Sequence, residues 1–135
     1  MCKNFFSLVF LILVFTINLS YAQEESSTSP IKVEQILFGT GIENREATGV
    51  DTVFSEDIGK VYCWCLVTGT TAETKISFVW SYQDKEMARV EVPVRSIRWR
   101  TWSYKTIRPE WTGNWKVEIL DEAGKVLESA SFQIQ

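Results

Sequence analysis

The chain has 135 residues, of which 45% are hydrophobic and 13% aromatic, and its formal net charge at pH 7 is −3. This length fits one domain, and the modest acidic balance carries no electrostatic signature of nucleic-acid binding. The sequence contains no histidine, which excludes His-based catalytic triads and removes the commonest metal ligand of proteins. We therefore expect no cofactor, no metal and no nucleic-acid partner.

The first 22 residues have the pattern of a secretory signal peptide. Lys3 supplies a short positive segment, residues 5–19 are uncharged and mostly apolar, and Ser20 and Ala22 are small residues suited to a cleavage site. The apolar run of about 15 residues is shorter than the roughly 20 that a membrane-spanning helix needs. We expect removal of residues 1–22 and export to the periplasm or the cell exterior. The alternative is an uncleaved signal, which would be the chain's only attachment to a membrane.

The remaining chain predicts a flexible leader followed by one β-rich domain. Residues 23–30 are polar and end in Pro30, as expected of a leader, and short apolar–polar alternations follow over residues 31–135. We predict an all-β, immunoglobulin-like antiparallel β-sandwich of about seven strands. The predicted strands are Lys32–Phe38, Lys60–Thr68, Thr74–Tyr82, Met87–Val94, Ile97–Ile107, Trp115–Leu120 and Lys125–Ile134.

The connections between these runs indicate antiparallel pairing. Residues 83–86 and 121–124 are short polar turns, and Gly124 can take the positive φ that a tight turn requires. The strand at Lys60–Thr68 is apolar at both alternating sets of positions and is therefore expected to be central. Residues 39–59 form a long polar connection with a weak extra strand at 48–54. We expect a solvated crossover between the sheets there, with a functional loop as the alternative.

Two cysteines remain in the predicted domain, Cys63 and Cys65. Residues two apart on a strand point to the same face, which places their Cβ atoms beyond disulfide distance. We interpret them as two buried thiols. An intermolecular disulfide and a soft-metal pair are the alternatives, and the lack of histidine disfavours the metal.

The second half of the chain carries a more specific pattern. It includes the stretches Arg-Trp-Arg-Thr-Trp-Ser-Tyr-Lys at 98–105 and Pro-Glu-Trp-Thr-Gly-Asn-Trp-Lys-Val-Glu at 109–118. With these motifs, residues 61–134 resemble the bacterial domain-of-unknown-function family 2914. The resemblance implies a small β-sandwich behind an export signal or a membrane anchor. It implies no activity and no catalytic residue.

One surface stands out chemically in an otherwise acidic chain. Five basic residues between positions 95 and 108 have no acidic residue among them. Strand periodicity places Arg98 and Arg100 on one face with Trp102 and Tyr104. Guanidinium groups beside aromatic rings suit carboxylate, phosphate or sulfate groups, with sugar or peptide stacking on the rings. The structural alternative is that arginine and lysine stems cover tryptophan edges and pair with acids on neighbouring strands.

Two further residues belong to this candidate site, Lys105 and Trp111. Trp111 follows Pro109 in a predicted turn before the sixth strand. It could be an exposed stacking platform, but we favour a plug at the corner of the sandwich. The predicted ligand-binding residues are thus Arg98, Arg100, Trp102, Tyr104, Lys105 and Trp111.

No catalytic constellation emerges from the sequence. The serines have no neighbouring base, and the adjacent carboxylates Asp121 and Glu122 lie in a turn where solvation explains them. We therefore expect a non-catalytic binding or interaction module whose partner is an unidentified protein or an anionic cell-envelope polymer. A carbohydrate-binding domain is the first alternative and a structural spacer the second. An uncharacterised hydrolase built from distant carboxylates would be the enzymatic alternative.

Overall fold

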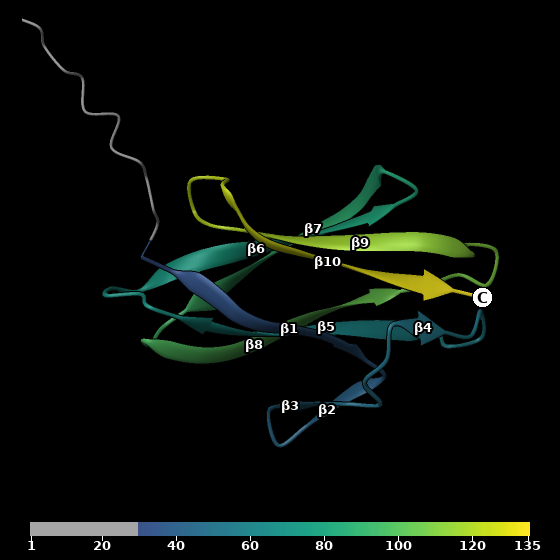
Figure 1. The fold of residues 1–135 in the computed structure, drawn as a ribbon, viewed down its shortest axis with the longest axis horizontal. Helices are drawn as coiled ribbons and strands as arrows, with labels where there is room; N and C mark the ends of the chain where they lie inside the picture. Colours follow the sequence, from purple (N-terminus) through teal and green to yellow (C-terminus); the bar gives the residue numbers. More distant parts are fainter. Residues whose placement is uncertain (1–29) are drawn as a thin grey trace, which may run out of the picture.

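The computed structural model describes residues 30–135, which form two facing β-sheets and a small separate hairpin (Figure 1). The predicted signal peptide, residues 1–22, and most of the predicted leader lie outside the described residues. One sheet has the order β1-β5-β8, the other β4-β10-β9-β6-β7, and β2 pairs with β3. The strands are β1 (Lys32–Gly39), β2 (Gly41–Glu43), β3 (Glu46–Thr48), β4 (Val53–Phe54), β5 (Lys60–Thr68), β6 (Thr74–Tyr82), β7 (Lys85–Val94), β8 (Arg98–Thr106), β9 (Gly113–Leu120) and β10 (Val126–Ile134).

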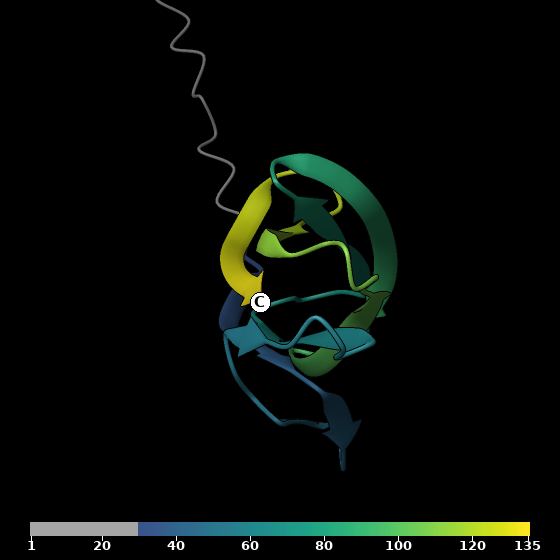
Figure 2. The same cartoon turned by 90° about the vertical axis from the view of Figure 1, so that its right-hand side faces the viewer.

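The predicted all-β sandwich is confirmed. Seven of the ten strands in residues 30–135 are long, and they coincide with the seven predicted runs to within two residues. Viewed end-on, the two sheets form separate layers (Figure 2), and the buried core residues of both sheets pack between these layers. The long strands pair antiparallel with their neighbours, and β5 occupies the centre of the three-stranded sheet as predicted.

The tight turns follow from residues that tolerate a left-handed backbone. Gln83 and Asp84 have φ values of 47° and 65° and alone connect β6 to β7. Positive φ at both central positions defines a two-residue turn whose twist matches that of the flanking strands. The predicted turn at 83–86 is therefore too long by two residues, and β7 begins at Lys85 rather than Met87. Gly124, with a φ of 88°, closes the turn between β9 and β10 as expected.

The connection over residues 39–59 is where the prediction was incomplete. It does cross between the sheets, but the extra strand predicted at 48–54 is only β4, which pairs parallel with β10. Residues 41–48 form the unpredicted β2–β3 hairpin, whose turn at Asn44 and Arg45 has φ values of 48° and 64°. Its strands have three residues each, too few for a periodic signal to show in the sequence.

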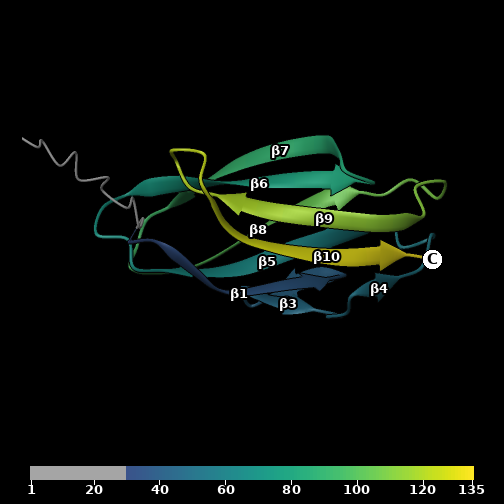
Figure 3. The same cartoon turned by 45° about the horizontal axis from the view of Figure 1, so that its top comes forward.

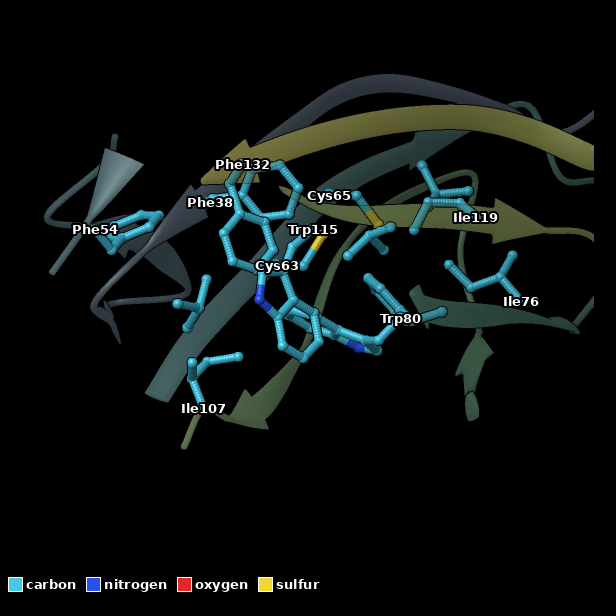
Figure 4. Packing of buried hydrophobic residues seen from close by; sticks show 14 of the residues in the cluster. Phe38, Phe54, Cys63, Cys65, Ile76, Trp80, Ile107, Trp115, Ile119 and Phe132 are labelled. Carbon is cyan, nitrogen blue, oxygen red and sulfur yellow. The ribbon is translucent and has the colours of Figure 1, made fainter. Parts of the chain in front are cut away.

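Figure 3 shows strands β7, β6, β9 and β10 of the larger sheet side by side in that order. The core is built from aromatic and branched side chains of both sheets (Figure 4). Phe132 of β10 lies near its centre, with ring centroids 4.7 Å from Phe38 on β1 and 5.9 Å from Trp115 on β9. Trp80 is fully buried, and its indole N–H donates to the hydroxyl of Ser103 on the opposite sheet at 3.0 Å. This bond satisfies a polar group that burial would otherwise leave unpaired, and it joins the two layers.

Strand β5 is buried on both of its faces, and this positions the candidate site. Its inward side chains, Val61, Cys63, Cys65 and Val67, are 0% exposed and belong to the core. Its outward side chains include Trp64 and Leu66, which are 2% and 7% exposed although they point away from the other sheet. A further element must therefore cover the outer face of the three-stranded sheet.

Candidate functional site

The outer face of the three-stranded sheet carries four of the six predicted site residues. Strand β8 presents Arg98, Arg100, Trp102 and Tyr104 on alternate positions, as the periodicity predicted. The antiparallel register sets these residues opposite Thr68, Leu66, Trp64 and Tyr62 of β5, in that order. Basic residues thus occupy one end of this face and aromatic residues the other.

The β2–β3 hairpin covers part of this face, below the three-stranded sheet in Figure 1. The indole N–H of Trp64 donates to the backbone carbonyl of Arg45 at 2.8 Å. The Arg45 guanidinium donates in turn to the carbonyl of Arg100 at 3.3 Å, and Glu46 forms an ion pair with the Arg100 side chain. These contacts explain how Trp64 is buried on a face that points away from the core.

A hollow of about 530 Å³ lies between the hairpin and the sheet, and we call it the hairpin hollow. Arg98 is exposed there and has no side-chain partner among residues 30–135, whereas the Arg100 side chain is 39% exposed and paired with Glu46. An unpaired guanidinium offers five N–H donors in a fixed planar fork. The hollow is lined by Gln35, Glu46, Trp64, Leu66, Arg98 and Arg100.

The aromatic end of the same face is more open. Tyr104 is 51% exposed, and its ring centroid lies 5.5 Å from that of Tyr62 across the strand pair. The Lys60 ammonium sits 4.8 Å from the Tyr104 ring centroid, within range of a cation–π interaction. Trp102, which faces Trp64, is only half-buried. This end therefore has ring surface available beside the Lys60 ammonium.

The remaining predicted residues, Lys105 and Trp111, form a separate cluster. Trp111 is half-buried, with its ring centroid 6.0 Å from that of Trp115, and its carbonyl accepts a bond from the Trp115 indole N–H at 3.1 Å. The charged ends of Lys105 and Arg108 lie 5.1 Å and 5.6 Å from its ring centroid. This arrangement fits the favoured interpretation of Trp111 as a corner plug. The charged ends of Lys105 and Arg108 lie over its ring.

Ion pairs neutralise much of the basic stretch that the sequence singled out. Arg95 pairs with Glu73 at 3.4 Å and Arg108 with Glu110 at 2.7 Å, and these side chains are more than half exposed. Exposed pairs of this kind contribute little to stability, typically about 0–1 kcal/mol. They do lower the number of cations available to a ligand, which leaves Arg98 as the prominent unpaired one among the described basic residues of this stretch.

The two cysteines lie on the opposite, inner side of β5. Both thiols are free and buried, as predicted. Burial raises the pKa of Cys65 to about 12, and burial together with the neighbouring Cys65 raises the pKa of Cys63 well above its ordinary value. The thiols are thus protonated at neutral pH, which makes them poor nucleophiles and poor metal ligands.

Sequence reasoning missed the contributions from outside β8. Gln35 on β1, Glu46 on β3 and Trp64 on β5 all line the hairpin hollow. One signal was present: a strand apolar on both faces requires cover on both. Which segment provides that cover, and which acid reaches Arg100, depends on contacts 54 residues apart in the chain.

Two further observations concern the described residues only. Within residues 30–135, no three His, Cys, Asp or Glu side chains gather as a metal site would require. The same part of the chain holds no helix long and apolar enough to cross a membrane.

Comparisons with known proteins give one family match. The model of the family described as protein of unknown function DUF2914 matches residues 73–134, which run from the start of β6 to the end of β10. No curated protein matches the chain. Among solved structures, a beta-glucosidase from Kluyveromyces marxianus is similar with a TM-score of 0.44 and 8% identity, over 78% of this chain and 14% of that chain. A similarity of that degree carries no argument about activity.

Proposed function

We propose that this chain is an exported, non-catalytic module that binds an acidic cell-envelope polymer. The family whose model matches residues 73–134, DUF2914, has no known function. The proposal of binding therefore rests on the candidate site, and that of export on the signal pattern of residues 1–22. The observation that carries the proposal is Arg98, an unpaired guanidinium beside a second arginine in the hairpin hollow. Such a fork can donate two parallel bonds to one carboxylate, phosphate or sulfate group.

The shape of the site favours a polymer over a protein surface. A stable protein–protein interface buries roughly 800 Å² on each partner. The hairpin hollow, at about 530 Å³, is suited to one acidic group and its immediate neighbours. Open ring surface at Tyr104 and Tyr62 lies further along the same face, where an adjoining sugar of the polymer could stack.

Binding of an acidic oligosaccharide tests this proposal. We expect the domain to bind oligogalacturonate more tightly than oligoglutamate, and Arg98→Gln to weaken the binding about tenfold or more, the loss expected for a charge-assisted hydrogen bond. Titration calorimetry at low and at physiological salt provides the measurement. Arg89→Gln is the matched control, because it removes the same charge from β7 on the other sheet. Equal binding by the two variants would contradict the proposal, and tighter binding of oligoglutamate would favour a protein partner.

Two specific observations favour the other candidate functions. The exposed Tyr104 ring beside Tyr62 favours a carbohydrate-binding role in which stacking outweighs charge. In that case Tyr104→Ala would reduce binding more than Arg98→Gln. The Arg100–Glu46 ion pair and the half-buried Trp102 favour a structural spacer. For a spacer, neither Tyr104→Ala nor Arg98→Gln would change which envelope components bind to the protein.

A further inference from the structure

The outer face of the five-stranded sheet holds a second hollow, of about 700 Å³, that the sequence did not indicate. Its volume lies within the roughly 300–1,000 Å³ typical of small-molecule sites. Residues from β6, β9 and β10, the β6–β7 turn and the segment at β4 line it. We call it the amide trough, and its lining includes Thr52, Ser81, Gln83, Asp84, Asn114, Lys116, Ser131 and Gln133.

Side-chain amides form an ordered row in this trough. Gln133 of β10 lies directly opposite Asn114 of β9, and the Gln133 amide N–H donates to the Asn114 side-chain oxygen at 3.0 Å. The Gln135 amide donates to the Gln133 side-chain oxygen at 3.4 Å. The side-chain oxygens of Asn114 and Gln133 thus each accept one bond from a neighbouring amide, whereas the Asn114 NH₂ group has no partner among residues 30–135.

A third amide joins this row from the turn. The backbone N–H of Gln83 donates to the carbonyl of Asn114 at 3.1 Å, which fixes the turn against the start of β9. A Cβ at Gly113 would lie 3.1 Å from the Gln83 side-chain nitrogen, so the glycine leaves room for the amide. With strands about 4.8 Å apart, Gln83, Asn114 and Gln133 span about 10 Å, the width of one or two sugar rings.

Two serine hydroxyl groups lie on the same face, each two residues along the chain from Gln83 or Gln133. Ser81 and Ser131 both pair in register with Lys116, one from each side of β9. The Lys116 ammonium is engaged by Glu118 at 3.4 Å, and Asp84 supplies one negative charge. The trough thus combines amides and hydroxyls with little net charge, in contrast to the hairpin hollow.

We propose that the amide trough binds a neutral saccharide through hydrogen bonds rather than ring stacking. Each side-chain amide carries both donors and an acceptor, so it can bond neighbouring sugar hydroxyls that themselves donate and accept. Trp115 and Phe132 form the floor but are each 1% exposed, which leaves no ring face for stacking. The near-neutral lining disfavours an ionic ligand. This inference is independent of the function proposed for the hairpin hollow.

The test follows the side-chain amides by NMR. The ¹⁵N-labelled domain is titrated with maltotriose, cellotriose and chitotriose, three neutral trisaccharides. We expect one of them to shift the side-chain NH₂ signals of Asn114 and Gln83 in a saturable way. Asn114→Ala/Gln133→Ala should weaken this binding about tenfold or more, since each neutral hydrogen bond contributes up to about tenfold. Arg98→Gln, on the other sheet, should leave it unchanged.

Specific results would overturn the inference. These are no saturable shift with any of the three sugars, equal binding by the double variant, or saturable shifts of the same signals with uncharged tetraglycine and not with sugars. Asn114 and Gln133 are exposed, so their replacement should preserve the fold, which a thermal melt checks. If the double variant melts early, Asn114→Asp keeps the side-chain shape and removes the NH₂ donor, and the same loss of binding is expected.

Discussion

The two outer faces of this sandwich are built from the same alternation of side chains but meet different surroundings. On the three-stranded sheet the outward positions of β5 hold Trp64 and Leu66, and the β2–β3 hairpin lies over them. On the five-stranded sheet the corresponding outward positions hold Ser81, Lys116 and Ser131, of which Ser81 is buried, Lys116 half-buried and Ser131 exposed. The difference shows that the large side chains of Trp64 and Leu66 are buried by a hairpin from the same chain, whereas a polar position such as Ser131 stays exposed without such a cover.

Removal of the covered tryptophan is the strongest test of this difference. Trp64→Ala should lower the free energy of unfolding by about 3–5 kcal/mol, because it empties the space beneath the hairpin and leaves the carbonyl of Arg45 unpaired. Chemical denaturation provides the measurement. Ser131→Ala, on the open face, should change stability by no more than about 0.5 kcal/mol. Similar losses of unfolding free energy in the two variants would contradict this, because Trp64 beneath the hairpin would then contribute no more to stability than the exposed Ser131.

The inner side of β5 offers a second test, through pH. Cys63 and Cys65 bind their protons more tightly in the folded than in the unfolded chain, so the unfolded chain loses protons first as pH rises. Stability should therefore be unaffected below the ordinary thiol pKa of 9.0 and fall above it, towards pH 12. The slope should approach about 1.4 kcal/mol per pH unit for each thiol.

Denaturation curves at pH 8, 9 and 10 measure this slope. Cys63→Ala/Cys65→Ala is the control, since it removes both thiols and keeps every other side chain of the wild-type protein. We expect a steeper loss in the wild-type chain than in this variant. Parallel losses in both would indicate that the inner side of β5 is accessible to water.

Of the test substitutions, the smallest loss of stability is expected for Glu46, the hairpin acid that pairs with Arg100. Its replacement should also raise the affinity for the ligand. Glu46→Gln breaks an ion pair whose side chains are 39% and 55% exposed, so the unfolding free energy should fall by less than about 1 kcal/mol. The same change frees Arg100 to join Arg98. Affinity for oligogalacturonate, measured by calorimetry, should rise several-fold. A loss of affinity would show that Glu46 belongs to the binding surface instead of competing with the ligand.

Most of the fold could be predicted from the sequence because strand periodicity depends only on residues close together in the chain. The seven long strands, the central place of β5 and the turn at Gly124 all follow from side chains within a few residues of one another. The face shared by Arg98, Arg100, Trp102 and Tyr104 followed from the same periodicity. The amide trough did not, because Gln83, Asn114 and Gln133 belong to three different segments and meet only through strand register.

The sequence by itself determined which residues alternate, and hence the all-β sandwich, its buried thiols and the position of its arginine-bearing strand. Only the tertiary structure decided which of those arginines are free. Arg100 is paired with Glu46 and Arg98 is not, because a short hairpin from a distant part of the chain folds onto the outer face of the sheet. Such pairings depend on where segments meet in space, and no local pattern of side chains specifies that.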